Sequence, residues 1–146
     1  MKDEIYKIGD RLLLLEEWQD RLGLQDWAIG LRYNCRQEDL ELEEAAGETH
    51  WNYTLKTAII YIVSEEVFGE RILDFDFEKT LVHELLHLKF SLFDIGKKDY
   101  ESNVLDLARH GLIDDLARAL VMAKRGETER KLAVPKIINR GELNEK

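Results

Sequence analysis

Apolar residues in the N-terminal part of the chain recur every three to four positions. Between residues 4 and 22 they are Ile5, Ile8, Leu12, Leu15, Trp18 and Leu22. This spacing predicts an amphipathic α-helix over residues 4–22. Gly23 follows directly and can end that helix, because glycine readily adopts the left-handed backbone found after a helix C-terminus.

Two later segments alternate apolar and polar residues, as strands with one buried face do. The first covers residues 26–33 and places Trp27, Ile29, Leu31 and Tyr33 on one side. The second covers residues 47–63 and predicts a β-hairpin that turns near Lys56-Thr57. The acidic stretch 38–44 between them is expected to be a solvated loop or a frayed helical turn rather than a binding patch.

Helical patterns return in the C-terminal half of the chain. Residues 64–73 predict a short helix or loop, and residues 77–93 predict a helix that Asp76 can cap. A longer helix is expected over residues 100–124. Its apolar stripe would consist of Val104, Leu105, Ala108, Leu112, Leu116, Ala119 and Leu120.

The order helix, strand, hairpin, helix, helix predicts an α+β fold, with residues 1–125 as a single domain. A small twisted sheet would pack against the helix at 77–93, which would pack in turn on the long helix after it. Residues 126–146 are highly charged and contain Pro135, so they are expected to form a weakly ordered tail. Within that tail, residues 132–138 could dock on the domain.

Composition narrows the possible classes of function. The 146 residues carry a net charge of −9, which argues against a direct nucleic-acid partner. The single cysteine, Cys35, is expected to fill space in the core rather than to act as a ligand or nucleophile. No apolar run approaches the length of a membrane span, and the N-terminus lacks an apolar targeting segment, so we expect a soluble, cytoplasmic protein.

The pentad His83-Glu84-Leu85-Leu86-His87 lies within the helix predicted at 77–93. Positions i and i+4 share one face of a helix, so His83 and His87 can bind a single metal ion with Glu84 beside it. Zinc prefers nitrogen ligands, and a catalytic zinc keeps one position for water. The spacing predicts a zinc site with Glu84 as general base. The alternative is a helix with two surface histidines and no metal, which the apolar neighbours of the pentad disfavour.

A catalytic zinc needs a third protein ligand. The candidates on the following helix are Glu101, Asp106, His110, Asp114 and Asp115. His110 is preferred because imidazole suits zinc and because Asp106 or Asp114 could orient its ring. Glu101 is the alternative third ligand. Asp114 and Asp115 are otherwise expected to be solvated.

The chain resembles a known protein family in four stretches, of which the one that contains the pentad is the most specific. The stretches are residues 22–27, 51–58, 80–88 and 113–120. They resemble small zincin-like metallopeptidases of phages and bacterial mobile elements, over roughly residues 20–124. The resemblance implies a minimal zincin-like fold and zinc-dependent peptide hydrolysis. Members of that group tend to carry an acidic residue where this chain has His110, whereas the more distantly similar SprT-like zincins use three histidines.

The sequence therefore predicts a zinc metallopeptidase that cleaves a peptide or protein substrate. His50, Tyr53 and Tyr61 are candidates for stabilising the oxyanion, because the β segment should flank the cleft. The outer strand could pair with an extended peptide. Two alternatives stay open: a zinc-stabilised binding or regulatory module with four protein ligands, and a zinc amidohydrolase that acts on another amide.

Overall fold

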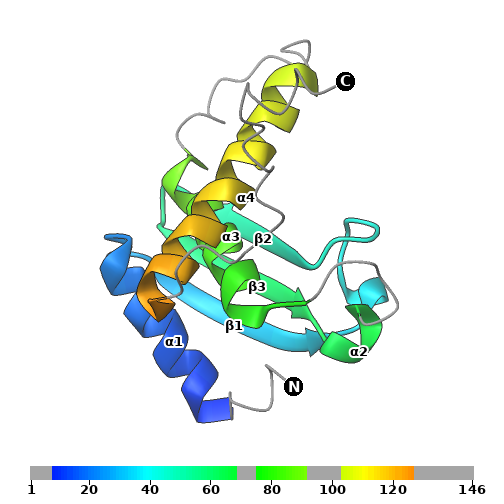
Figure 1. Ribbon diagram of the computed structural model, residues 1–146, viewed down its shortest axis with the longest axis horizontal. Helices are drawn as coiled ribbons and strands as arrows, with labels where there is room; N and C mark the ends of the chain where they lie inside the picture. The colour runs from blue at the N-terminus through cyan, green and yellow to red at the C-terminus, as the bar shows by residue number, and fades with distance from the viewer. Residues whose placement is uncertain (1–7, 69–74, 92–102, 127–146) are drawn as a thin grey trace, which may run out of the picture.

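The computed structural model of the chain describes residues 8–68, 75–91 and 103–126 (Figure 1). In chain order the elements are α1 (Ile8–Arg21), β1 (Ala28–Cys35), the 3-10 turn η2 (Gln37–Asp39), β2 (Gly47–Asn52), β3 (Thr57–Val63), α2 (Glu65–Phe68), α3 (Phe77–Lys89) and α4 (Asn103–Arg125). The predicted α+β class is confirmed, and each predicted helix and strand is found, although α3 ends at Lys89 and not at the predicted residue 93. The predicted tail beyond Gly126 and the candidate ligand Glu101 lie outside the described residues.

The three strands form one sheet in the order β1-β3-β2. β2 and β3 are antiparallel, which confirms the hairpin, whereas β1 runs parallel to β3. The connecting turn covers residues 53–56 and so begins before the Lys56-Thr57 position expected from the sequence. Lys56 closes it with a positive φ of 50° and donates its backbone N–H to the carbonyl of Tyr53 at 3.2 Å. In the sheet formed by the described residues, β2 pairs with β3 alone and is an edge strand.

Helices α1, α3 and α4 share one core with the sheet, and α3 lies in its middle (Figure 1). Ile60 of the central strand, Leu81 of α3 and Ile113 of α4 are fully buried in this core. The apolar side of β1 packs against the same core through Ile29, Leu31 and Tyr33, as its alternation predicts. None of the described helices is long and apolar enough to cross a membrane.

The buried face of α4 differs from the predicted apolar stripe. Three members of that stripe are exposed: Ala108, Leu112 and Ala119. The residues that pack against α3 and the core are Ile113, Ala117 and Val121. Compared with the predicted stripe, the observed buried face of α4 is rotated about the helix axis by about one residue. His110 lies one turn before Ile113, so this rotation directs it toward α3.

The buried face of α1 also departs from the prediction. Leu12 is half exposed, whereas Arg11 is buried. The Arg11 guanidinium lies 4.7 Å from the ring centroid of Tyr33 and 4.6 Å from that of Phe77. An arginine between two aromatic faces gains cation–π attraction that apolar periodicity does not register.

Candidate metal centre

The helix that carries the pentad is fixed at its first turn by Asp76. The Asp76 side chain accepts a hydrogen bond from the backbone N–H of Lys79 at 3.1 Å, which confirms the predicted N-cap. Leu81 and Leu85 anchor α3 in the core with no exposed surface. His83 and His87 lie beside this buried stripe, are only half-buried, and face His110 of α4.

The structure brings the three predicted histidine ligands together. His83 and His87 of α3 place their Nε2 atoms 3.3 Å apart. The ring centroid of His110 on α4 lies 6.0 Å from that of His83 and 5.0 Å from that of His87. One nitrogen of each ring lies within 4.8 Å of one nitrogen of the other two.

This donor set fits a zinc ion. Two nitrogen atoms bound to tetrahedral zinc at about 2.0–2.1 Å lie about 3.3–3.4 Å apart, which matches the Nε2–Nε2 distance of 3.3 Å. Burial, with the nearby His83, lowers the pKa of His87 to about 4, and burial also lowers the pKa of His83. Both rings are therefore neutral near pH 7, as metal ligands must be. The same separation also suits a hydrogen bond between the rings, so metal content is the deciding measurement.

Asp114 contacts a different histidine from the one expected. Its Oδ1 atom lies 3.4 Å from Nδ1 of His83 and 3.7 Å from Nζ of Lys79. Asp114 therefore contacts His83 and not His110, the ring that it was expected to orient. Its side chain is 53% exposed, which agrees with the expectation that it is solvated. With Nδ1 held by a carboxylate, Nε2 of His83 faces the other rings, which is the usual arrangement around a metal-binding histidine.

Glu84 is buried between α3 and the edge strand β2. The Thr49 hydroxyl donates a hydrogen bond of 2.5 Å to Oε2 of Glu84. Burial raises the pKa of Glu84 to about 7, and the nearby Glu48 also acts to raise it, while the Thr49 hydrogen bond acts in the opposite direction. A carboxyl group that titrates near neutral pH is suited to accepting and returning a proton.

Gly47 allows this close approach of β2 to Glu84. A Cβ atom at Gly47 would lie 2.9 Å from Oε1 of Glu84 and 3.0 Å from Cγ2 of Thr80. Real Cβ atoms essentially never show a contact of 2.9 Å, and one of 3.0 Å is unusually tight, so a larger residue at this position would force the Glu84 carboxyl group to shift. Sequence reasoning missed both Gly47 and Thr49, because their importance depends on how the strand packs against α3.

A cleft of about 620 Å³ lies over these groups. Its lining includes Thr49 and Trp51 of β2, the three histidines and Glu84. The loop before β2 contributes Leu42, Ala45 and Ala46. The acidic stretch 38–44 includes part of the 3-10 turn η2 and, except for Leu40, is exposed, as expected for a solvated loop or helical turn.

The three candidates for an oxyanion donor do not line the cleft. His50 contacts Oε2 of Glu48 at 2.9 Å and packs edge-on against Tyr61, with 5.7 Å between ring centroids. Strand alternation puts this pair on the sheet face opposite Ile60 and the helices. Tyr53 instead packs against Trp27 with 6.0 Å between centroids. None of the three candidates is therefore placed at the cleft: strand register turns His50 and Tyr61 to the far face of the sheet, and Tyr53 lies in the β2–β3 turn.

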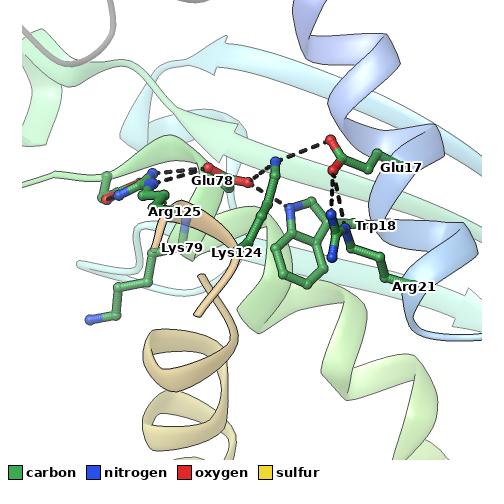
Figure 2. Close-up of polar contacts among 8 residues, drawn as sticks. Glu17, Trp18, Arg21, Glu78, Lys79, Lys124 and Arg125 are labelled. Atoms are coloured by element: carbon green, nitrogen blue, oxygen red, sulfur yellow. Dashed lines mark hydrogen bonds and ion pairs between the residues drawn. The ribbon is translucent and has the colours of Figure 1, made fainter. Parts of the chain in front are cut away.

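A buried ion-pair cluster connects the first turn of α3 to the last turn of α4 and to α1 (Figure 2). Glu78 accepts hydrogen bonds from Trp18 Nε1 at 2.8 Å, from Lys124 Nζ at 2.5 Å and from Arg125 Nη2 at 3.0 Å. Arg125 also donates to both carboxylate oxygens of Asp76, at 2.7 and 3.0 Å. The cluster therefore fixes the relative position of the two helices that carry the histidines.

Comparisons with protein-family models, with curated proteins and with solved structures find no match to this chain. The function proposed for the site therefore rests on its residues and their geometry.

Proposed function

We propose that this chain is a zinc-dependent metallopeptidase with a minimal zincin-like domain. The observation that carries the proposal is the convergence of three imidazole rings beside the buried carboxyl group of Glu84, at the base of a cleft. His83, His87 and His110 would hold the ion. Bound zinc would lower the pKa of a coordinated water and polarise a substrate carbonyl.

The roles of the protein residues follow from their contacts. Asp114 keeps Nδ1 of His83 occupied, so that Nε2 is available as the ligand atom. Glu84 would take a proton from the attacking water, with Oε2 of its carboxyl group held by the Thr49 hydroxyl. Glu84 then returns that proton to the departing amine. The hydrogen bond from Thr49 keeps the carboxyl group oriented through both transfers.

A peptide is the substrate that best suits the surroundings of the site. Edge strand β2 lines the cleft beside Glu84, and an extended peptide could pair with its backbone. An amidohydrolase for another amide has no need of such an edge. A closed structural zinc site would need a fourth ligand, whereas three donor side chains gather here in the described part of the chain. The buried free thiol of Cys35 agrees with a reducing, cytoplasmic setting.

Zinc content and peptide cleavage, measured side by side on four forms of the full chain, test this proposal. We expect about one zinc ion per chain in the wild type and in Glu84→Gln, with cleavage lost in Glu84→Gln. His110→Ala should lose both zinc and cleavage. His50→Ala is the control, because this histidine lies on the other face of the sheet, and it should keep both.

Each alternative gives a different result in the same measurements. A wild type that takes up no zinc would refute the proposal. Wild-type zinc affinity in His110→Ala would move the third ligand to another residue, with Glu101 the first to test. Zinc that is lost in His50→Ala would place the ion at the cluster of Glu41, Glu48 and His50 instead.

A further inference from the structure

The apolar part of the cleft lining lies on the loop before β2 and on the residue that leads into α3. It consists of Leu42, Ala45, Ala46 and Phe75, which we call the apolar subsite. Trp51 of β2 is a further apolar residue of the cleft lining. Its charged neighbours are already engaged: Asp76 pairs with Arg125, and Lys79 lies 3.7 Å from Asp114. This end of the cleft therefore offers apolar contact rather than a partner for a charged group.

The backbone of Leu42 is held in place by hydrogen bonds, and its side chain is 56% exposed. Its backbone N–H donates to Oε1 of Glu48 at 2.8 Å, and the N–H of Glu41 donates to Oε2 at 3.1 Å. Gln37 donates from Nε2 to the carbonyl of Leu42 at 3.2 Å. Glu48 is itself buried, so a carboxylate from β2 anchors the loop. An exposed leucine held this firmly is preorganised for contact with a ligand.

The floor of the apolar subsite is rigid and has small side chains. Ala45 and Ala46 pack against a buried cluster formed by Cys35, Leu40 and Val63, and Phe75 packs against the same cluster. The carbonyl of Ala46 accepts the backbone N–H of Val63 at 3.0 Å, which ties the floor to the end of β3. Two consecutive alanines leave room for a larger side chain from outside.

The apolar subsite is continuous with the catalytic groups. Ala46 directly precedes Gly47, the position at which a Cβ atom would touch Oε1 of Glu84. Adjacent Cα atoms are about 3.8 Å apart. Ala46, in the floor of the subsite, is therefore one residue along the chain from the glycine that contacts the proposed general base. A substrate side chain bound there would belong to a residue next to the amide on which Glu84 would act.

We infer that the apolar subsite binds a bulky aliphatic or aromatic side chain adjacent to the scissile bond, and so selects peptides that carry one. The inference rests on the proposed peptidase function, because it assigns the substrate class of the same cleft. Leu42 is the residue that determines specificity, since it covers the bound side chain from the rim.

Two blocked peptides that differ at one central residue, leucine in one and serine in the other, test the inference on the zinc-loaded full chain. We expect the wild type to favour the leucine peptide at least about tenfold in kcat/KM, with Leu42→Ala reducing the preference below about threefold. Leu42→Met should preserve the preference. Leu55→Ala is the matched control, because Leu55 is 70% exposed and lies in the β2–β3 turn.

Binding of the same peptides to the zinc-loaded Glu84→Gln chain, measured by fluorescence anisotropy, separates this inference from the proposed chemistry. Selective binding of the leucine peptide that depends on Leu42, without cleavage by the wild type, would support the apolar subsite and refute the peptidase. Equal kcat/KM values and equal binding affinities for the two peptides would overturn the inference. A leucine preference that survives Leu42→Ala would overturn it as well.

Discussion

The hydroxyl group of Thr49 on β2 donates a hydrogen bond of 2.5 Å to Oε2 of Glu84 on α3. This contact joins the edge strand directly to the proposed catalytic helix. It also favours the ionised form of a carboxyl group that burial otherwise keeps protonated. The ionisation of Glu84 therefore depends on the position of the strand.

The stability of the metal-free protein should depend on pH through Glu84. Its pKa is raised from 4.5 to about 7 in the folded chain, so its contribution is fully present below pH 4.5 and is lost as pH rises through 7. This change corresponds to roughly 3 kcal/mol. In Glu84→Gln the side chain is neutral at every pH. We expect the free energy of unfolding of Glu84→Gln to increase relative to that of the wild type as pH rises from 4.5 to about 8.

Urea unfolding in the presence of a chelator, at several pH values, measures that difference. The lowered pKa values of His83 and His87 act in the opposite direction, since they reduce stability as pH falls below 6.5. Both proteins contain these histidines, so the comparison of the two isolates Glu84. Parallel stability curves would contradict the burial of an ionisable group at this position.

Substitution of Gly47 by alanine should impair cleavage more than zinc binding. The new methyl group would lie 2.9 Å from Oε1 of Glu84 and would push the carboxyl group out of place, while the histidines lie elsewhere. We expect a loss of at least about tenfold in kcat, and a loss of about 1–3 kcal/mol in stability from overpacking. Zinc titration and steady-state kinetics on the same preparation measure the two effects.

Gly111→Ala provides the matched control, because a Cβ at Gly111 meets nothing within 4 Å. Gly111 lies inside α4 next to His110, where alanine favours the helix by about 1 kcal/mol. This variant should be fully active and slightly more stable. A Gly47→Ala protein with wild-type kcat would show that Glu84 does not need this close strand contact.

Removal of the charge on Asp114 should weaken zinc binding. Asn at this position can no longer hold Nδ1 of His83 through a charged acceptor, and such partners typically contribute about 10–100-fold to metal affinity. Competition with a zinc-binding dye measures the change. Asp115→Asn is the control, since Asp115 is 70% exposed and pairs with Arg118. Equal affinities in the two variants would leave Asp114 without a role in orienting His83.

Glu78→Gln should destabilise the fold and loosen the link between α3 and α4. The substitution leaves Lys124 and Arg125 without their buried partner carboxylate, and breaking a buried pair costs about 3–5 kcal/mol. Glu17→Gln removes an acceptor of Lys124 whose side chain is 39% exposed, and should cost below about 1 kcal/mol. Thermal unfolding of both variants tests the ranking, and a reversed order would show that this cluster contributes little.

Local patterns in the sequence were enough to predict the elements and the pentad. Helical periodicity places His83 and His87 on one face whatever the rest of the fold does. His110 was preferred as the third ligand only because imidazole suits zinc. Its position next to His83 and His87 depends on which face of α4 is buried, and the predicted apolar stripe gave that face incorrectly.

Other contacts arise from packing between distant segments, and their residues look ordinary in the sequence. Gly47 begins a strand and Thr49 continues it, and neither position signals contact with Glu84. Glu78 resembles any acidic residue in the first turn of a helix, yet it is 1% exposed. The parallel pairing of β1 with β3 could not be predicted from the alternation of apolar and polar residues either. Alternation shows which face of a strand is buried, but not which strand lies next to it.

Edge strand β2 has a strand partner on one side in the described part of the chain, and this leaves backbone groups that a second molecule could also pair with. At neutral pH the net charge of −9 repels identical copies. Near pH 5, where the net charge vanishes, that repulsion is gone. The feature that would admit a substrate thus makes self-association and aggregation in mild acid an expected side effect.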